Sequence, residues 1–334
     1  MTTIVAEHDF LALAEPLRRE LMAHCYRMLG SVHDAEDQVQ ETYLRAWRSY
    51  ARFEGRSSLR TWMYQIATNT CLTALESRSR RPLPTGLGAP ASEGSGPLES
   101  RPEVTWLEPL PDRMIGGVGG TAPQDPEAVA LSSENIRLAF IAALQHLTAQ
   151  QRAVLLLRDV LAWRAAEVAE ALDISVAAVN SALQRARAHV DELAPTADAS
   201  VDVEDPVIRA QLERYVTAFE AYDMEGIVQM LTEDAVWEMP PFTGWYHGNI
   251  DIGVLISTHC PASGPDDMRL VVTSANGQPV IAVYMREDDG VHRAFQLQQL
   301  TVGPQGVSAV TCYFDVGLFD TFGLPRVFDE RLRP

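Results

Sequence analysis

Residues 31–81 read SVHDAEDQVQETYLRAWRSYARFEGRSSLRTWMYQIATNTCLTALESRSRR, and this stretch decides the fold of the first part of the chain. Ser31, with Asp34 three residues later, resembles a capping box and predicts the start of a helix. Apolar side chains recur at spacings of three and four and predict a core-facing stripe: Ala35, Val39, Tyr43, Ala46, Trp47 and Tyr50. The opposite face is charged and rich in amides, with Glu36, Asp37, Gln40, Glu41, Leu44 and Arg48.

A second helix is expected after the break at Gly55. Ser57 or Ser58 can cap this helix, and its pattern runs to about Ser79. Arg, Trp, Tyr and Asn side chains lie along it, and it ends in a basic cluster. The first helix therefore suits a protein partner. The second suits DNA, because arginine binds phosphates and aromatic rings stack on bases.

Composition limits the class of protein. A length of 334 residues allows two or three compact domains, and 46% hydrophobic residues support globular cores. No apolar run approaches the ~18 residues of a membrane span, and the N-terminus lacks a signal-peptide pattern. Four scattered cysteines without a CxxC motif predict thiols in a reducing cytoplasm, with no metal site and no other cofactor.

The net charge of −18 is unevenly distributed. Residues 1–81 hold 11 arginines and 10 acidic residues, and residues 132–190 hold 6 and 5, so each of these segments carries +1. Residues 82–131 carry −5, and residues 191–334 carry −15. Because DNA affinity depends on neutralising phosphates, we expect the free protein to bind DNA poorly and a partner to supply most of the positive surface.

Residues 82–131 read as an acidic, flexible linker because they hold most of the turn formers of the chain. The GGVGG at 116–120 is not a phosphate loop, since no strand precedes it and no GK[ST] follows. The apolar island WLEPLPD, at 106–112, is expected to dock on another part of the protein.

Residues 132–193 predict helices again. Thr148 and Gln151 form a capping-box pattern, and RAAEVAEALDISVAAVNSALQRARAHV has the spacing of a helix-turn-helix. Asp173 stands at the turn position usually held by glycine, and Asp tolerates the left-handed conformation better than most residues. Ser175 is expected to cap the second helix of the motif.

From Asp205 the pattern changes to α+β. Helices at about 206–221 and 224–231 precede strand-like runs: AVWEM, RLVVTSA, PVIAVYMR, AFQLQQLTV and GVSAVTCYF. Helices leading into a curved antiparallel sheet are expected, and MLTEDAVWEMPPFTGWYHG resembles the NTF2-like, or SnoaL-like, cone.

Taken in order, the segments resemble an extracytoplasmic-function (ECF) sigma factor of the sigma-70 family with an NTF2-like C-terminal extension. DAEDQVQETYLRAW, SSLRTWMYQIATNTCLTALE, LTAQQRAVLLLRDVLAW and AVNSALQRAR carry the resemblance. It implies a multidomain fold: an all-α region 2 bundle (9–81), the linker (82–131), an all-α region 4 helix-turn-helix (132–193) and an α+β cone (204–330). The implied function is to direct core RNA polymerase to promoters, and the protein is not expected to be an enzyme.

The resemblance also implies the partner surfaces. The helix from Asp34 to Tyr50 would bind the clamp of the polymerase largest subunit through Asp37, Gln40, Glu41, Leu44 and Arg48. The alternative is a solvated charged face. The linker would pass through the polymerase towards its active-site cleft.

Promoter contacts are implied for both helical modules. The −10 element would be recognised and opened by Arg60, Trp62, Gln65, Asn69, Thr73, Arg78, Arg80 and Arg81, although Trp62 could equally be buried. The −35 element would be read by the recognition helix through Ser175, Ala177, Ala178, Asn180, Ser181 and Gln184, with Arg185 and Arg187 on phosphates. Many ECF factors have Lys and Arg where this chain has Asn180 and Ala182, so an inherited −35 consensus is in doubt.

The C-terminal cone could enclose a pocket for a small ligand, lined by Trp237, Met239, Phe242, Trp245, Tyr246, His247, Tyr284, Phe295 and Tyr313, but most of these could equally be core. Asp251, Asp315 and His247 are the groups available for catalysis, and their spacing does not pair a base with a donor. We therefore expect a regulatory domain that makes a separate anti-sigma protein unnecessary. Two alternatives remain: a one-component helix-turn-helix regulator, and an NTF2-like isomerase or cyclase with accessory DNA-binding domains.

Overall fold

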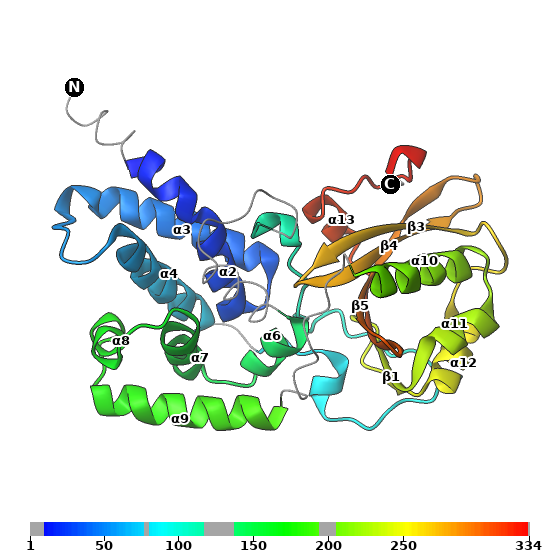
Figure 1. Ribbon diagram of the computed structural model, residues 1–334, viewed down its shortest axis with the longest axis horizontal. Coiled ribbons are helices and arrows are strands. Elements are labelled where there is room, and N and C mark those ends of the chain that lie inside the picture. The colour runs from blue at the N-terminus through cyan, green and yellow to red at the C-terminus, as the bar shows by residue number, and fades with distance from the viewer. Residues whose placement is uncertain (1–9, 77–79, 117–136, 194–204, 333–334) are drawn as a thin grey trace. The chain divides into compact units, whose positions relative to one another are not determined.

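The computed structural model describes residues 10–76, 80–116, 137–193 and 205–332. The chain forms two compact units (Figure 1). The first unit combines residues 1–81 with residues 107–197, and the second combines residues 82–106 with residues 198–334. The chain therefore passes from one unit to the other three times.

The first unit is helical. Its N-terminal part contains α2 (Arg18–Leu29), α3 (Val32–Ser49) and α4 (Leu59–Leu75), with short 3-10 turns at Glu15–Leu17 and Tyr50–Arg52. Gly30 ends α2 in the left-handed conformation, with φ of 69°, and the Ser31 hydroxyl then accepts the Asp34 amide to cap α3. Ser58 caps α4 in the same way through the Thr61 amide. The predicted helix starts are confirmed.

The second helical part contains α6 (Leu138–Leu144), α7 (Ala149–Leu155), a π-helical turn (Leu156–Val160), α8 (Ala165–Leu172) and α9 (Val176–Leu193). Thr148 and Gln151 form the predicted capping box of α7. Asp173 has φ of 52° at the end of α8, as the turn between α8 and α9 requires. The Ser175 hydroxyl accepts the Ala178 amide at the start of α9. The helix-turn-helix prediction is confirmed.

The two helical parts pack into one unit through a buried polar junction. Arg152 of α7 is 3% exposed and donates to the Met28 carbonyl at the end of α2 and to the Gln145 side chain. Gly30 leaves no room for a side chain there, because a Cβ would lie 2.8 Å from Leu107 and 2.9 Å from Gln145. The junction therefore joins α2, α7 and residue 107 of the predicted linker.

The second unit is an α+β domain. It contains α10 (Pro206–Glu220), α11 (Met224–Met230), α12 (Asn249–His259) and the short α13 (Gly317–Thr321). Its strands are β1 (Leu231–Glu238), β2 (Trp245–His247), β3 (Met268–Ala275), β4 (Gln278–Arg286), β5 (His292–Gly303) and β6 (Gly306–Tyr313). They form one sheet in the order β2-β1-β6-β5-β4-β3, antiparallel except for the β1–β6 pair. A core that includes Tyr215, Trp237, Ile281 and Leu300 lies between the sheet and the helices α10, α11 and α12.

The predicted flexible linker is wrong for residues 82–115. Residues 82–106 belong to the C-terminal unit, and residues 107–115 pack in the first unit, each held by specific hydrogen bonds. The expectation that WLEPLPD docks is confirmed, because Leu107 and Leu110 are fully buried. Short 3-10 turns lie at Pro84–Leu87 and Asp112–Met114. The rest of the predicted linker, residues 117–131, lies outside the described residues.

Candidate polymerase- and DNA-binding surfaces

The predicted polymerase-binding residues form one stripe along α3. Asp37, Gln40, Leu44 and Arg48 are exposed, and Glu41 is half-buried. Glu41 accepts a hydrogen bond from Arg45 Nε at 2.6 Å. The opposite face packs through Val32, Ala35, Val39, Thr42 and Ala46. Helix α3 thus has one face packed in the unit and one face exposed, as a helix that binds a partner protein requires.

The −10 residues predicted on α4 also share one face. Asn69 and Thr73 are exposed, while Trp62 and Gln65 are half-buried. The ring of Trp62 lies 4.8 Å from the ring of Phe53, which precedes α4. Trp62 and Gln65 line a cavity of about 580 Å³, together with Trp163, Arg164 and Glu167 at the start of α8. Trp62 is therefore neither fully buried nor free to stack on both faces.

The predicted −10 arginines differ in their partners. Arg60 pairs with Glu20 at 2.7 Å and lies 5.3 Å from the centre of the Tyr64 ring. Arg80 is exposed, and Arg78 lies outside the described residues. Arg81 is largely buried and forms ion pairs with Asp34 at 2.7 Å and Glu108 at 3.6 Å. Arg81 is thus engaged in the first unit and is not displayed for DNA.

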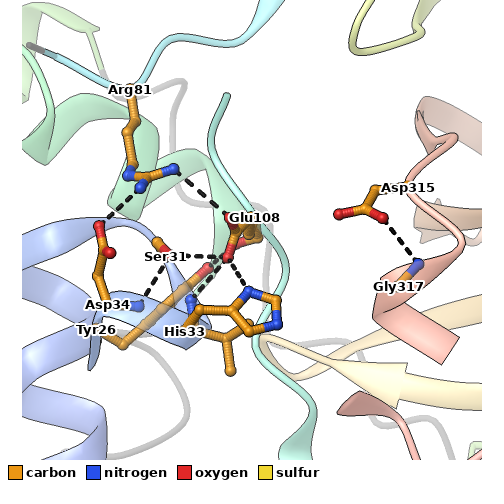
Figure 2. A network of polar contacts seen from close by, with 9 residues as sticks. Tyr26, Ser31, His33, Asp34, Arg81, Glu108, Asp315 and Gly317 are labelled. Carbon is orange, nitrogen blue, oxygen red and sulfur yellow. Dashed lines mark hydrogen bonds and ion pairs between the residues drawn. The ribbon is translucent and has the colours of Figure 1, made fainter. Parts of the chain in front are cut away.

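Glu108 is the centre of the network around Arg81 (Figure 2). Its carboxylate accepts hydrogen bonds from the Ser31 hydroxyl at 2.8 Å and the Val32 amide at 3.1 Å, and it lies 3.2 Å from His33 Nδ1. Its backbone carbonyl accepts from the Tyr26 hydroxyl. Burial alone would raise the pKa of Glu108, but the contacts from His33, Arg81 and Ser31 together outweigh it and lower that pKa.

The predicted −35 residues surround the exposed start of α9. Exposed side chains include Ser175, Ala177, Ala178, Asn180, Ser181 and Gln184, while Val179, Ala182 and Leu183 face the core. Arg185 donates to Ser181 four residues earlier. Arg187 forms an ion pair with Asp159 at 2.6 Å, and its side chain remains 56% exposed. The face of α9 predicted to contact bases is therefore exposed. Of the two arginines predicted to contact phosphates, Arg187 is already paired with Asp159.

The residues predicted to line a pocket in the cone fall into separate groups. Trp237, Met239 and Tyr246 are part of the buried core, and Phe242 and Phe295 pack against that core. Tyr284 instead packs edge-on against Phe319 and Phe328. Tyr313 is buried, His247 is exposed, and half-buried Trp245 donates its Nε1–H to the Ala89 carbonyl.

The groups considered for catalysis have structural contacts. Asp251 accepts the Gly94 amide, and Asp315 accepts the Gly317 amide at 2.7 Å (Figure 2). No contact joins Asp251, Asp315 and His247 to one another in the described ranges.

The described ranges contain no cluster of three or more His, Cys, Asp or Glu side chains fit to hold a metal ion. No described helix has the length and hydropathy of a membrane span.

Comparison with known proteins decides the family. The family descriptions "Sigma-70 region 2", "Sigma-70, region 4" and "SnoaL-like domain" match residues 13–81, 137–190 and 212–309. The chain is 56% identical over 318 residues to the ECF RNA polymerase sigma factor SigG of Mycobacterium tuberculosis, covering 95% of this chain and 84% of that protein. The chain belongs to the ECF sigma factors.

Two further similarities concern SigJ of the same organism. This sigma factor is 33% identical to SigJ over 241 residues, which is 72% of this chain and 66% of SigJ. The crystal structure of SigJ matches with a TM-score of 0.61 over 95% of this chain and 99% of that chain, at 24% identity. The predicted architecture of two helical sigma domains and an NTF2-like domain is therefore confirmed.

Sequence reasoning misplaced one exposed apolar residue of α3 and did not single out another on α9. Trp47 was expected in the core stripe, but it is 45% exposed beside Leu44, which is 46% exposed. Ala46 is buried as expected, and Thr42, which was not predicted in the stripe, is buried as well. Val176, 44% exposed at the first turn of α9, was not singled out. Its position directly after the predicted cap Ser175, in the first turn of the helix, could have indicated that it is exposed.

Proposed function

We propose that this ECF sigma factor binds core RNA polymerase, directs it to specific promoters and starts transcription there. The observation that carries the proposal is the exposed stripe on α3, which lies in region 2 and keeps its predicted polymerase-binding residues on one open face. The exposed start of α9 in region 4, where the residues predicted to contact the −35 element lie, supports it. We propose that the protein acts in the cytoplasm, where the polymerase is.

The α3 surface suits a protein partner because its centre is apolar and its edges are charged. Leu44 and Trp47 are the exposed apolar side chains, and Asp37, Gln40 and Arg48 flank them. Protein interfaces commonly place apolar anchors inside a polar rim, and tryptophan is enriched among the residues that dominate binding. The clamp of the polymerase largest subunit is the partner we propose for this stripe.

The promoter contacts divide between two faces. On α4, Trp62, Gln65, Asn69 and Thr73 would take part in opening the −10 element, with Arg60 and Arg80 near the phosphates. On α9, Asn180, Ser181 and Gln184 can hydrogen-bond to base edges in the major groove, and Arg185 can contact a phosphate. Arg81 drops out of the proposed set because it holds Asp34 and Glu108.

The C-terminal domain is proposed to modulate transcription, in place of a separate anti-sigma protein. Residues 191–334 carry −15, so they can compete with DNA for basic surface on the sigma regions or set their arrangement. A role as an enzyme has no support from these groups, because Asp251 and Asp315 accept backbone amides and neither contacts the exposed His247 in the described ranges.

Run-off transcription with core polymerase on the DNA upstream of the protein's own gene tests the sigma activity. The double variant Leu44→Ala/Trp47→Ala should bind core polymerase at least about tenfold more weakly, because truncating an interfacial tryptophan commonly costs 2 kcal/mol or more. Ile250→Ala is the control, since Ile250 is 69% exposed on α12. Core binding unchanged in the double variant would contradict the polymerase surface, and no binding by the wild-type protein would contradict the sigma function.

A truncation after Leu193 is not a clean test of the C-terminal domain. It removes residues 194–334, and with them most of the second unit, but keeps residues 82–106, which belong to the same unit. Leu98 would lose the core against which it packs, and Thr85 would lose Glu238. Point variants in the full chain are therefore the better probe.

A further inference from the structure

The C-terminal domain holds a segment of chain that precedes it by more than a hundred residues. We call residues 82–101 the docked segment; in Figure 1 they form the cyan stretch. The SnoaL-like match covers residues 212–309 and so does not include this segment. The docked segment is thus an addition to the recognised domain, taken from the connection between regions 2 and 4.

Side chains of the domain bind mainly the backbone of the docked segment. Asp251 and His259, eight residues apart on α12, contact the Gly94 amide and the Gly96 carbonyl, each at 2.9 Å. Trp245 of β2 donates to the Ala89 carbonyl at 2.8 Å, and its own carbonyl accepts the Ser92 amide at 2.7 Å. These contacts are made to backbone groups of the segment, which turns at Glu93–Gly96, and they depend little on its side chains.

The end of the segment pairs with the loop after β1. The Arg101 amide donates to the Pro241 carbonyl, and the Thr243 amide donates to the Glu99 carbonyl, each at 2.9 Å. Ser100 and Phe242 form an antiparallel bridge. The segment is therefore added to the domain in the manner of a bound peptide strand.

The start of the segment covers a buried carboxyl group. Glu238, at the end of β1 and 7% exposed, accepts hydrogen bonds from the Thr85 amide at 3.0 Å and the Thr85 hydroxyl at 3.2 Å. No cation forms an ion pair with Glu238 in the described structure. The Thr85 donors are the contacts that compensate the buried carboxyl group there.

Two features of the docked segment bear on how specifically and how strongly it is held. Gly94 fits only because it lacks a side chain, since a Cβ would lie 2.3 Å from the Asp251 carbonyl oxygen and 2.8 Å from the Leu255 amide. The segment is rich in Gly, Pro and Ser, and of its side chains only those of Pro82, Leu83 and Pro84 are buried. Hydrogen bonds exchanged with water stabilise weakly, and ordering such a segment costs entropy, so the docked state is held by a small margin.

We propose that this face of the C-terminal domain is a receptor for the docked segment of the same chain, and that docking and release of residues 82–101 set the transcriptional output. The proposal rests on the proposed function, because it names the surface through which the domain modulates the sigma regions. A segment whose amides are paired with the domain is withheld from any other partner. Release also frees about 20 residues of the connection between regions 2 and 4.

The test uses the full-length protein and the variant Gly94→Ala, with Gly264→Ala as its matched control. A Cβ at Gly264 meets no atom within 4 Å, and this glycine lies in the same domain. Hydrogen exchange of peptides from 83–101 should become at least about tenfold faster in Gly94→Ala, while exchange of β4 and β5 stays at the wild-type rate. Thr85→Val, which removes one hydroxyl and keeps the amide, should give a smaller increase. Gly264→Ala should match the wild type.

Run-off transcription is then measured for the same proteins, together with their binding to core polymerase. We expect Gly94→Ala to change the transcript yield by at least about threefold at unchanged core binding; a rise means that docking restrains initiation, and a fall means that docking assists it. Faster exchange of the segment with a yield equal to that of Gly264→Ala would overturn the proposal and leave the sigma function intact. Unchanged exchange in Gly94→Ala would overturn the docking itself. No transcript from the wild-type protein would overturn the proposed function and, with it, this use of the receptor face.

Discussion

Glu108 and Glu238 secure the two halves of the connection between regions 2 and 4, and their surroundings are opposite. In the first unit the connection supplies the carboxylate, and region 2 supplies the donors Ser31, Val32 and Arg81. In the C-terminal unit the domain supplies the carboxyl group, and Thr85 of the connection supplies both donors. Each half is therefore fixed by one carboxyl group, with the roles reversed.

The difference in partners gives the two groups opposite electrostatics. Burial disfavours both carboxylates, but Arg81, His33 and Ser31 lower the pKa of Glu108. At Glu238 burial prevails over the two Thr85 hydrogen bonds and raises the pKa to about 7. A cation beside one carboxyl group, and none beside the other, accounts for the reversal. The surroundings of Glu108 thus favour its charged form, whereas Glu238 titrates near neutral pH.

The largest effect is expected from Glu108→Ala. It removes one of the two carboxylate partners of Arg81 and the acceptor of the Val32 amide, and losing one member of this mostly buried network should destabilise α3 by about 2–3 kcal/mol. Hydrogen exchange of the α3 amides measures this local free energy. Glu103→Ala, an exposed carboxylate nearby in sequence, should change it by less than about 0.5 kcal/mol. A loss below about 1 kcal/mol for Glu108→Ala would mean that the network does not secure this half.

The next effect is a dependence of the C-terminal unit on pH. Because the pKa of Glu238 rises from 4.5 to about 7, its contribution to stability is complete below pH 4.5 and is lost as the pH rises through 7. At 1.36 kcal/mol per pKa unit the loss is about 3 kcal/mol. Hydrogen exchange of the β1 amides at pH 4.5 and 8.5 should show it, and Glu238→Gln should remove it. Glu233→Gln, an exposed position on β1, should leave the pH dependence of the wild type in place.

Sequence patterns predicted what apolar spacing and capping determine. Ser31, Thr148 and Ser175 cap their helices as expected, and Asp173 adopts the left-handed turn. Leu107 and Leu110 are buried because an apolar island in a polar stretch gains free energy by docking. Such signals depend on neighbours in sequence or on hydrophobicity, and both can be read without the fold.

The docked segment and the position of Arg81 could not be predicted in this way. Gly94, Ser92 and Ala89 bind through their backbone to residues 150 or more positions later, and a stretch rich in Gly, Pro and Ser has the composition of a flexible linker. Arg81 was assigned to DNA because it lies in a basic cluster, but it forms ion pairs with Asp34 and Glu108, each distant in sequence. Trp47 shows the limit of helical spacing, since adjacent positions differ by only 100° around the axis.

A smaller effect is expected from Thr85→Val, which sharpens the comparison at the C-terminal unit. The hydroxyl hydrogen bond favours the carboxylate, so its loss should raise the pKa of Glu238 further and weaken docking by about 1 kcal/mol. The chemical shift of the Glu238 carboxyl carbon, followed against pH, measures the change. Thr105→Val alters an exposed threonine and should leave the titration unchanged. An unaltered titration in Thr85→Val would show that the backbone amide alone compensates Glu238.

The smallest effect should come from His33→Gln, which separates charge from geometry at Glu108. The His33 side chain is 53% exposed, so its ion pair with Glu108 is screened by water and should contribute less than about 0.5 kcal/mol. The remaining difference between variant and wild type should vanish in 1 M salt, where the screening length is about 3 Å. Hydrogen exchange of the α3 amides below pH 6 measures both values. A larger loss of free energy that does not respond to salt would place His33 with Ser31 and Arg81 among the groups that fix the connection. The difference in pKa between Glu108 and Glu238 would then depend on all three of these donors, and not on the largely buried Arg81 alone.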